Sequence, residues 1–133
     1  MDQENESSAS ILWVNKIKAK KLSTLEFKPR YTYSKDVPFT EKDLQCPGAL
    51  FQVVKFQPQT SIKPHVHKTT VEVFYVQKGA GIIKINNKEF RCTPDDFFLC
   101  EPGDVHAFIN DTNEEFVILI FKTNEKDEDI YWT

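Results

Sequence analysis

The chain has 133 residues, of which 40% are hydrophobic and 28% charged, values typical of a globular protein with one domain. The formal net charge of −3 provides no overall attraction to nucleic acid or to anionic lipid, so we expect neither as a partner. No apolar run reaches the ~20 residues that cross a bilayer, and the acidic, polar residues 1–8 are unlike a secretory signal. These features predict a cytoplasmic protein.

Residues 1–10 lack apolar anchors and are predicted to be disordered, whereas residues 11–133 are predicted to form one domain. Ile17 and Ala19 alternate with lysines within residues 11–21, a pattern typical of a β-strand with one basic face. Lysines on such a strand usually protect a sheet edge from unwanted pairing. We prefer this interpretation to phosphate or nucleic-acid binding, because the run is short and has no interleaved aromatic residues.

A series of short apolar segments separated by turn residues begins at residue 49. The predicted strands cover residues 49–57, 61–67, 71–77, 81–85, 88–92, 97–100, 106–110 and 115–122. Asn86-Asn87 lies between two of them and is a typical two-residue hairpin turn. Only residues 40–44 resemble a helical turn, and the 11 phenylalanines suit a sheet-rich core. Many short strands at regular spacing predict an all-β protein, an antiparallel sandwich or a jelly roll.

The 3 cysteines, Cys46, Cys92 and Cys100, are odd in number and include no CxxC pair. This pattern disfavours a disulfide framework and favours a reducing compartment. We interpret each cysteine as a small buried apolar residue, with a thiol close to a metal as the alternative for Cys100.

The chain contains only 3 histidines, and two of them are two residues apart in a predicted strand. Alternate residues of a strand point to the same face, roughly 6–7 Å apart, so His65 and His67 can both reach one ion. After a short turn, Glu72 begins the next strand in phase with Phe74 and Val76, which are apolar and should face inward. A carboxylate inside a barrel is costly unless it is paired or bound to a metal.

His106 lies on a separate predicted strand and shares its face with Phe108 and Asn110. With the other two histidines and the carboxylate it forms a mixed nitrogen and oxygen donor set. Such a set suits one divalent transition metal (Fe, Mn, Ni, Cu, Co or Zn) and disfavours Ca or Mg. Four protein ligands leave one or two coordination positions open, as in catalytic sites. The alternative is that each histidine is an ordinary surface or core residue and that the carboxylate pairs with Lys55 or Lys63.

The spacing of these residues resembles the two sequence motifs of the cupin superfamily, in particular its small single-domain metal-binding members. The first motif, G(X)5HXH(X)3–4E(X)6G, matches at both histidines, the glutamate and Gly79, with Gln59 in place of the first glycine. The second motif, G(X)5PXG(X)2H(X)3N, matches at its last three residues, with Asp95 in place of glycine and Pro102 one position late. The resemblance covers residues 49–122. Its departures imply that the two substituted turns avoid positive φ, or that Asp95 tolerates it.

The resemblance implies a double-stranded β-helix (jelly-roll) cupin barrel with a metal inside. Its metal ligands would be His65, His67, Glu72 and His106. It also implies a homodimer, because such domains commonly pair through their sheets or exchange an N-terminal strand, for which residues 11–20 are the natural segment. Residues 129–132 could pack against the same barrel or against its partner.

The fold alone does not give the function, but the intact ligand set favours a metal-dependent enzyme that acts on a small organic molecule, because open metal sites tend to be catalytic. One interpretation is a dioxygenase-type oxidation, with Glu72 as ligand or as catalytic base, and another is isomerisation of a sugar or keto acid at a Lewis-acidic metal. In both, Phe74 and Phe108 would contact the substrate and Asn110 would donate a hydrogen bond to it. Core packing of the rings and a strand-end role for Asn110 are the structural alternatives. The alternative function is a non-catalytic module that binds or senses a sugar or metabolite.

Overall fold

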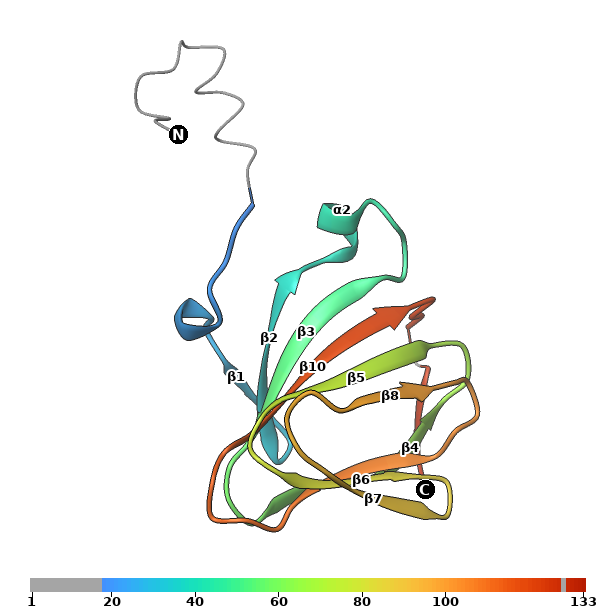
Figure 1. Ribbon diagram of the computed structural model, residues 1–133. Coiled ribbons are helices and arrows are strands. Elements are labelled where there is room, and N and C mark those ends of the chain that lie inside the picture. The colour runs from blue at the N-terminus through green and yellow to red at the C-terminus, as the bar shows by residue number, and fades with distance from the viewer. Residues whose placement is uncertain (1–17, 128) are drawn as a thin grey trace.

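The computed structural model describes residues 18–127 and 129–133, and the strands within them form two antiparallel sheets that face each other (Figure 1). One sheet has the order β1 (Lys28–Arg30), β2 (Tyr33–Phe39), β3 (Leu50–Phe56), β10 (Phe116–Thr123), β5 (Val71–Lys78), β8 (Phe97–Cys100). The other has the order β11 (Ile130–Trp132), β4 (Thr60–His67), β9 (His106–Asn110), β6 (Gly81–Ile85), β7 (Lys88–Cys92). The predicted all-β, double-stranded β-helix (jelly-roll) barrel is therefore confirmed.

Alternation along the strands sets what lies between the sheets. On β5, Glu72, Phe74 and Val76 are buried, while the residues between them remain partly exposed. The inward side chains meet Phe56 and Ile83, which come from opposite sheets, in one apolar core. Because the period of a strand is two residues, the same phase that buries the apolar residues of β5 also places Glu72 inside the barrel.

The short turns agree with the sequence analysis, with one exception. Ile85 pairs with Lys88 across the predicted two-residue hairpin. Helix α2 (Glu41–Leu44) is the single predicted helical turn, and beside it the described residues hold only the 3-10 turn η2 (Leu22–Thr24). No helix among them is long and apolar enough to cross a membrane.

The exception is backbone geometry at Gln59 and Asp95, which adopt φ of 61° and 77°. The expectation that both turns avoid positive φ is wrong, and the alternative that Asp95 tolerates it is correct. Side-chain contacts explain why the left-handed backbone is maintained. The Gln59 amide donates to the carbonyl oxygen of Thr112 at 3.0 Å, and the Asp95 carboxylate accepts from the Tyr75 hydroxyl.

The two ends of the chain differ from the predictions. Residues 11–17 of the predicted basic strand and the predicted disordered segment 1–10 lie outside the described residues, and residues 18–21 are exposed and not in a strand. That part of the strand prediction is wrong, because a few alternating lysines also suit a segment that runs over the surface. Strands β1, β2 and β11 were not predicted. At the C-terminus, β11 pairs with β4 of the same chain.

Gly79 lies where the backbone of the barrel leaves no space for a side chain. It follows β5 with φ of +80°, and a Cβ added there would lie 2.2 Å from the carbonyl oxygen of Glu115. Gly103 has φ of +90°, but an added Cβ would meet nothing within 4 Å. We predict that Gly79→Ala lowers the free energy of unfolding by about 3 kcal/mol or more and Gly103→Ala by only about 1 kcal/mol. Urea unfolding measures both, and equal losses would show that φ alone requires glycine at position 79.

Candidate metal centre

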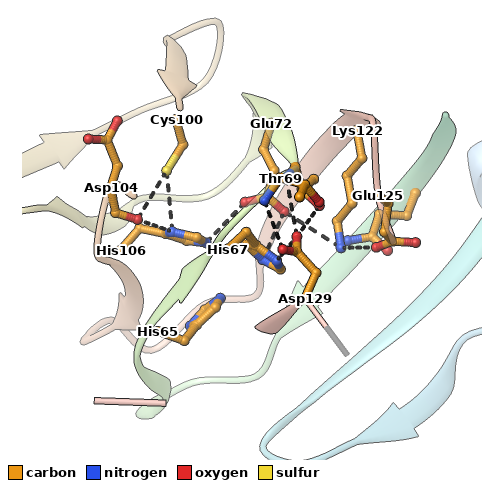
Figure 2. Close-up of polar contacts among 12 residues, drawn as sticks. His65, His67, Thr69, Glu72, Cys100, Asp104, His106, Lys122, Glu125 and Asp129 are labelled. Atoms are coloured by element: carbon orange, nitrogen blue, oxygen red, sulfur yellow. Dashed lines mark hydrogen bonds and ion pairs between the residues drawn. The ribbon is translucent and has the colours of Figure 1, made fainter. Parts of the chain in front are cut away.

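Four buried side chains converge between the two sheets (Figure 2). Strand β4 supplies His65 and His67, β9 supplies His106, and β5 supplies Glu72 from the opposite sheet. One ring nitrogen of each histidine lies within 4.8 Å of the other two. His65 and His106 are direct partners across the β4–β9 pair, which explains their proximity although they lie 41 positions apart in sequence.

The carboxylate faces the imidazoles closely. Glu72 Oε2 lies 3.0 Å from His106 Nε2, and Glu72 Oε1 lies 3.7 Å from His67 Nε2. The structure therefore brings together all four residues that the sequence predicted as metal ligands. His65, His67 and His106 form one group of donors that could hold a metal, and a second group of Glu72, Cys100 and His106 shares His106 with it.

Nδ1 of His65 and Nδ1 of His106 contact backbone carbonyl oxygens outside the cluster. His65 Nδ1 lies 2.9 Å from the carbonyl oxygen of Lys63, and His106 Nδ1 lies 3.3 Å from that of Asp104. Because a carbonyl oxygen can only accept, the contact of His65 places its proton on Nδ1 and leaves its Nε2 lone pair free. Cys100 Sγ also lies 3.2 Å from His106 Nδ1, and burial raises the pKa of this thiol to about 12, so it stays protonated.

The third histidine is backed by Asp129, whose Oδ2 lies 3.4 Å from His67 Nδ1. The same carboxylate accepts hydrogen bonds from the backbone N–H groups of Lys68, Thr69 and Thr70 at 2.7, 2.8 and 3.2 Å. Burial alone would raise the pKa of Asp129, but these hydrogen bonds outweigh it and hold the pKa at about 2. A carboxylate behind a histidine is the usual outer contact of a metal ligand, since it orients the ring and makes its other nitrogen more basic.

The electrostatics of the cluster favour a neutral form of two imidazoles and an ionised carboxylate. Burial lowers the pKa of His65 to about 4 and lowers that of His67 as well. Burial would raise the pKa of Glu72, but His106 and the Lys122 ammonium group outweigh it and bring the pKa to about 2. Metal ligation requires these protonation states, in which each donor atom carries a free electron pair.

Comparison with known proteins gives the family. A family model described as the cupin domain matches residues 52–122, more than half of the chain. The chain belongs to the cupin family. This finding confirms the resemblance drawn from the two motifs, whose histidines and glutamate are the four residues of the cluster.

Individual relatives are similar to this cupin only in part. The protein named Epoxidase atD of Aspergillus terreus is 30% identical over 59 residues, which are 42% of this chain and 18% of that protein. An oxalate-binding protein of Thermotoga maritima is 29% identical over 73 residues, 53% of this chain and 60% of that protein. The matched part is thus less than two thirds of either relative. The solved structure of a predicted oxalate decarboxylase from Thermotoga maritima has a TM-score of 0.73 at 18% identity, covering 79% of this chain and 97% of that chain, which shows the same fold.

The cluster of this cupin fits a transition metal on its own geometry. His106 Nε2 lies 3.0 Å from Glu72 Oε2. Glu72 Oε2 is buried and makes no well-aligned hydrogen bond. A buried carboxylate oxygen without a hydrogen bond is costly unless a cation binds it. A divalent metal held by three imidazole nitrogens and one carboxylate would satisfy both atoms.

The residues predicted to contact substrate have different surroundings. Phe108 lines a cavity of about 60 Å³ beside the cluster. Phe74 is fully buried and packs on the rings of Phe108 and His106, with centroids 4.9 and 5.5 Å apart. Phe74 therefore belongs to the core behind the site, as the structural alternative had it.

Asn110 lies at the end of β9 and is 1% exposed. Its amide nitrogen donates to the carbonyl oxygens of Phe56, Gln57 and Glu114 at 2.9, 3.1 and 2.8 Å. Its side-chain oxygen accepts from the backbone N–H of Thr112 at 3.0 Å. These contacts tie the strand end to two neighbouring turns, which is the alternative role, and a substrate contact for Asn110 stays a prediction without geometric support.

Sequence analysis missed Lys122 and Asp129. Lys122 Nζ lies 3.6 Å from Glu72 Oε1 and lines the same cavity. Its phase with the buried isoleucines of β10 could have revealed that it points inward. Asp129 carries no comparable signal, because it precedes a short strand with no buried residue.

Two smaller expectations are also corrected. The lysines proposed as partners of the carboxylate lie elsewhere, since Lys63 is exposed and Lys55 Nζ lies over the Phe27 ring at 3.9 Å. Cys46 is exposed, contrary to its prediction, whereas Cys92 and Cys100 are buried as predicted.

The pKa values predict how the metal-free protein responds to acid. The pKa of His65 is about 4 in the fold against 6.5 as the model-compound value, so between these values the unfolded chain binds a proton that the folded chain does not. Stability should therefore fall as the pH drops from 6.5 to 4, by about 3 kcal/mol from His65 alone. Glu72 adds a further loss as its pKa of about 2 is approached from 4.5.

Urea unfolding of EDTA-treated protein from pH 7 to 4 measures this slope. His65→Gln should flatten it, while Val66→Ala, on the opposite face of the same strand, should leave it unchanged. An unaltered slope in the His65 variant would contradict the assignment of a neutral, buried imidazole.

Proposed function

We propose that this cupin is a metal-dependent enzyme that acts on a small organic molecule, with one divalent transition metal (Fe, Mn, Ni, Cu, Co or Zn) at its centre. The ligands would be His65, His67, Glu72 and His106. The observation that carries the proposal is the convergence of three imidazoles and an ionised carboxylate beside a buried cavity. A bound metal would supply Lewis acidity, and also redox chemistry if it is Fe, Mn, Ni or Cu.

Two reactions suit such a centre, a dioxygenase-type oxidation and the isomerisation of a sugar or keto acid. Isomerisation requires a base that removes a proton from the substrate. Glu72, with a pKa of about 2, is a weak base, which supports its role as a ligand over its role as a catalytic base. The name of the Aspergillus terreus relative, an epoxidase, also supports oxidation. We therefore favour the oxidation.

The chain's own residues would bind and orient the substrate. The cavity wall away from the histidines consists of apolar side chains, among them Val54, Phe108 and Ile120. They would hold the hydrocarbon part of the substrate and exclude water from the reacting end. Phe74, packed behind His106, would keep that imidazole in place.

The alternative function is a module that binds a small molecule without turnover. The name of the Thermotoga maritima relative, an oxalate-binding protein, supports this alternative. Measurement of turnover separates it from the enzyme.

Three further features stay predictions. We propose that residues 11–133 form one domain, that the protein is a homodimer and that it is cytoplasmic. Analytical ultracentrifugation of the full chain tests the second of these.

Metal binding can be measured directly. Protein purified without an affinity tag should contain close to one transition metal per chain by elemental analysis, because the four donors are preorganised. The double variant His65→Ala/His106→Ala should lose it, and Val66→Ala should retain it. Absence of metal from the wild type, both as purified and after reconstitution, would contradict the proposal.

The reaction expected of the protein depends on which metal it binds. With Fe, Mn, Ni or Cu bound, we expect oxygen uptake that depends on an added small organic substrate and is reduced at least about 100-fold by Glu72→Gln, which removes a charged ligand. An oxygen electrode measures the rate. Ligand binding with no uptake and no isomerisation, at full metal occupancy, would favour the binding module instead.

A further inference from the structure

Lys122 is the least expected residue of the cavity. It lies on β10 directly across from Glu72, and only 9% of it is exposed. Its Nζ is 3.6 Å from Glu72 Oε1 and 3.1 Å from Glu125 Oε2 (Figure 2). The Lys122 ammonium group is thus buried between two carboxylates, beside the metal ligands.

The cavity has two chemically different ends. The histidines, Glu72, Lys122 and Gln52 form its polar end, while Val54, Phe56 and Ile120 belong to its apolar wall. Gln52 Oε1 accepts from Lys35 Nζ at 3.5 Å, which leaves the Gln52 amide N–H groups as donors. Among the described residues that line the cavity, Lys122 is the only lysine or arginine and Glu72 the only carboxylate.

The charges of the groups that line this polar end do not balance once a metal is present. A divalent ion carries two positive charges, Lys122 adds a third, and Glu72 is the one carboxylate among the described lining residues. Glu125, whose side chain is 35% exposed, and Asp129, which lies behind His67, carry negative charges but do not line the cavity. A cavity of low dielectric whose lining carries surplus positive charge gains free energy when an anion enters it.

We propose that Lys122 selects the ligand of this site by charge, so that the cavity accepts a small carboxylate with a short hydrocarbon part. This inference rests on the proposed function, because the metal ligands form one side of the same cavity. The carboxylate group would lie at the polar end beside Lys122 and Gln52, and the hydrocarbon part would lie against the apolar wall. A neutral molecule of the same shape would leave the lysine without a partner inside the cavity and would bind more weakly.

The test uses protein loaded with Co(II), whose visible spectrum changes when a ligand enters the metal site. Propionate serves as the anionic probe, and imidazole at pH 8 serves as the neutral one. Lys122→Met should weaken propionate binding at least about 10-fold and leave imidazole binding within about 2-fold, because a charged hydrogen bond is lost only with the anion. Lys122→Arg should restore the preference for propionate at least in part.

Lys55→Met is the matched control, because Lys55 is partly buried but lies over the Phe27 ring and does not line the cavity. It should leave both affinities unchanged. Equal weakening of both probes by Lys122→Met would overturn the proposal and show that Lys122 only positions Glu72. Unchanged propionate binding would overturn it too, with the metal site intact. Failure of the wild type to take up cobalt would instead overturn the proposed function and this inference with it.

Discussion

The buried carboxylate of Glu72 is the constraint around which the site is arranged. At 3% exposure it would be costly without positive charge or donors nearby, and β5 lies between β10 and the edge strand β8. Cross-strand pairing places Lys122 on one side of it and Cys100 on the other. The histidines of the facing sheet fill the remaining side. The register of β5 with β10 is thus what brings the ammonium group to the carboxylate, and a shift by one residue would separate them.

The C-terminal end of the chain completes the site from behind. Strand β11 pairs with the residues of β4 that carry His65 and His67, and the preceding Asp129 bonds to the turn that joins β4 to β5. One carboxylate therefore holds the turn that leads to Glu72 by hydrogen bonds and also lies 3.4 Å from Nδ1 of His67. Orientation of the ligands depends on residues about sixty positions apart in sequence, so the site forms only when the barrel has closed.

Local pattern accounts for most of what sequence analysis could predict. Parity within single strands placed His65, His67 and Glu72 on the inside, since a strand that buries apolar residues also buries whatever shares their phase. It could not place Asp129, whose role comes from a contact made across the sheet. Gln59 was misjudged for the same reason, because the contact that maintains its left-handed backbone comes from Thr112 on another strand end. The turn residues and partners that depend on distant contacts were the ones missed.

The phenylalanines of the core affect the chemistry of the site as well as stability. Phe108 packs on Phe56 and Phe74, with ring centroids 5.7 and 4.9 Å apart, and the three rings belong to the apolar core beside the charged groups. The effective dielectric constant of such apolar surroundings is low, so each charge interacts with its neighbours more strongly than it would in water. A single lysine can therefore influence which ligands enter, whereas at an exposed site salt and water would screen it. The apolar core raises the free-energy cost of burying Glu72. The same core strengthens the effect of the Lys122 charge on which ligands bind.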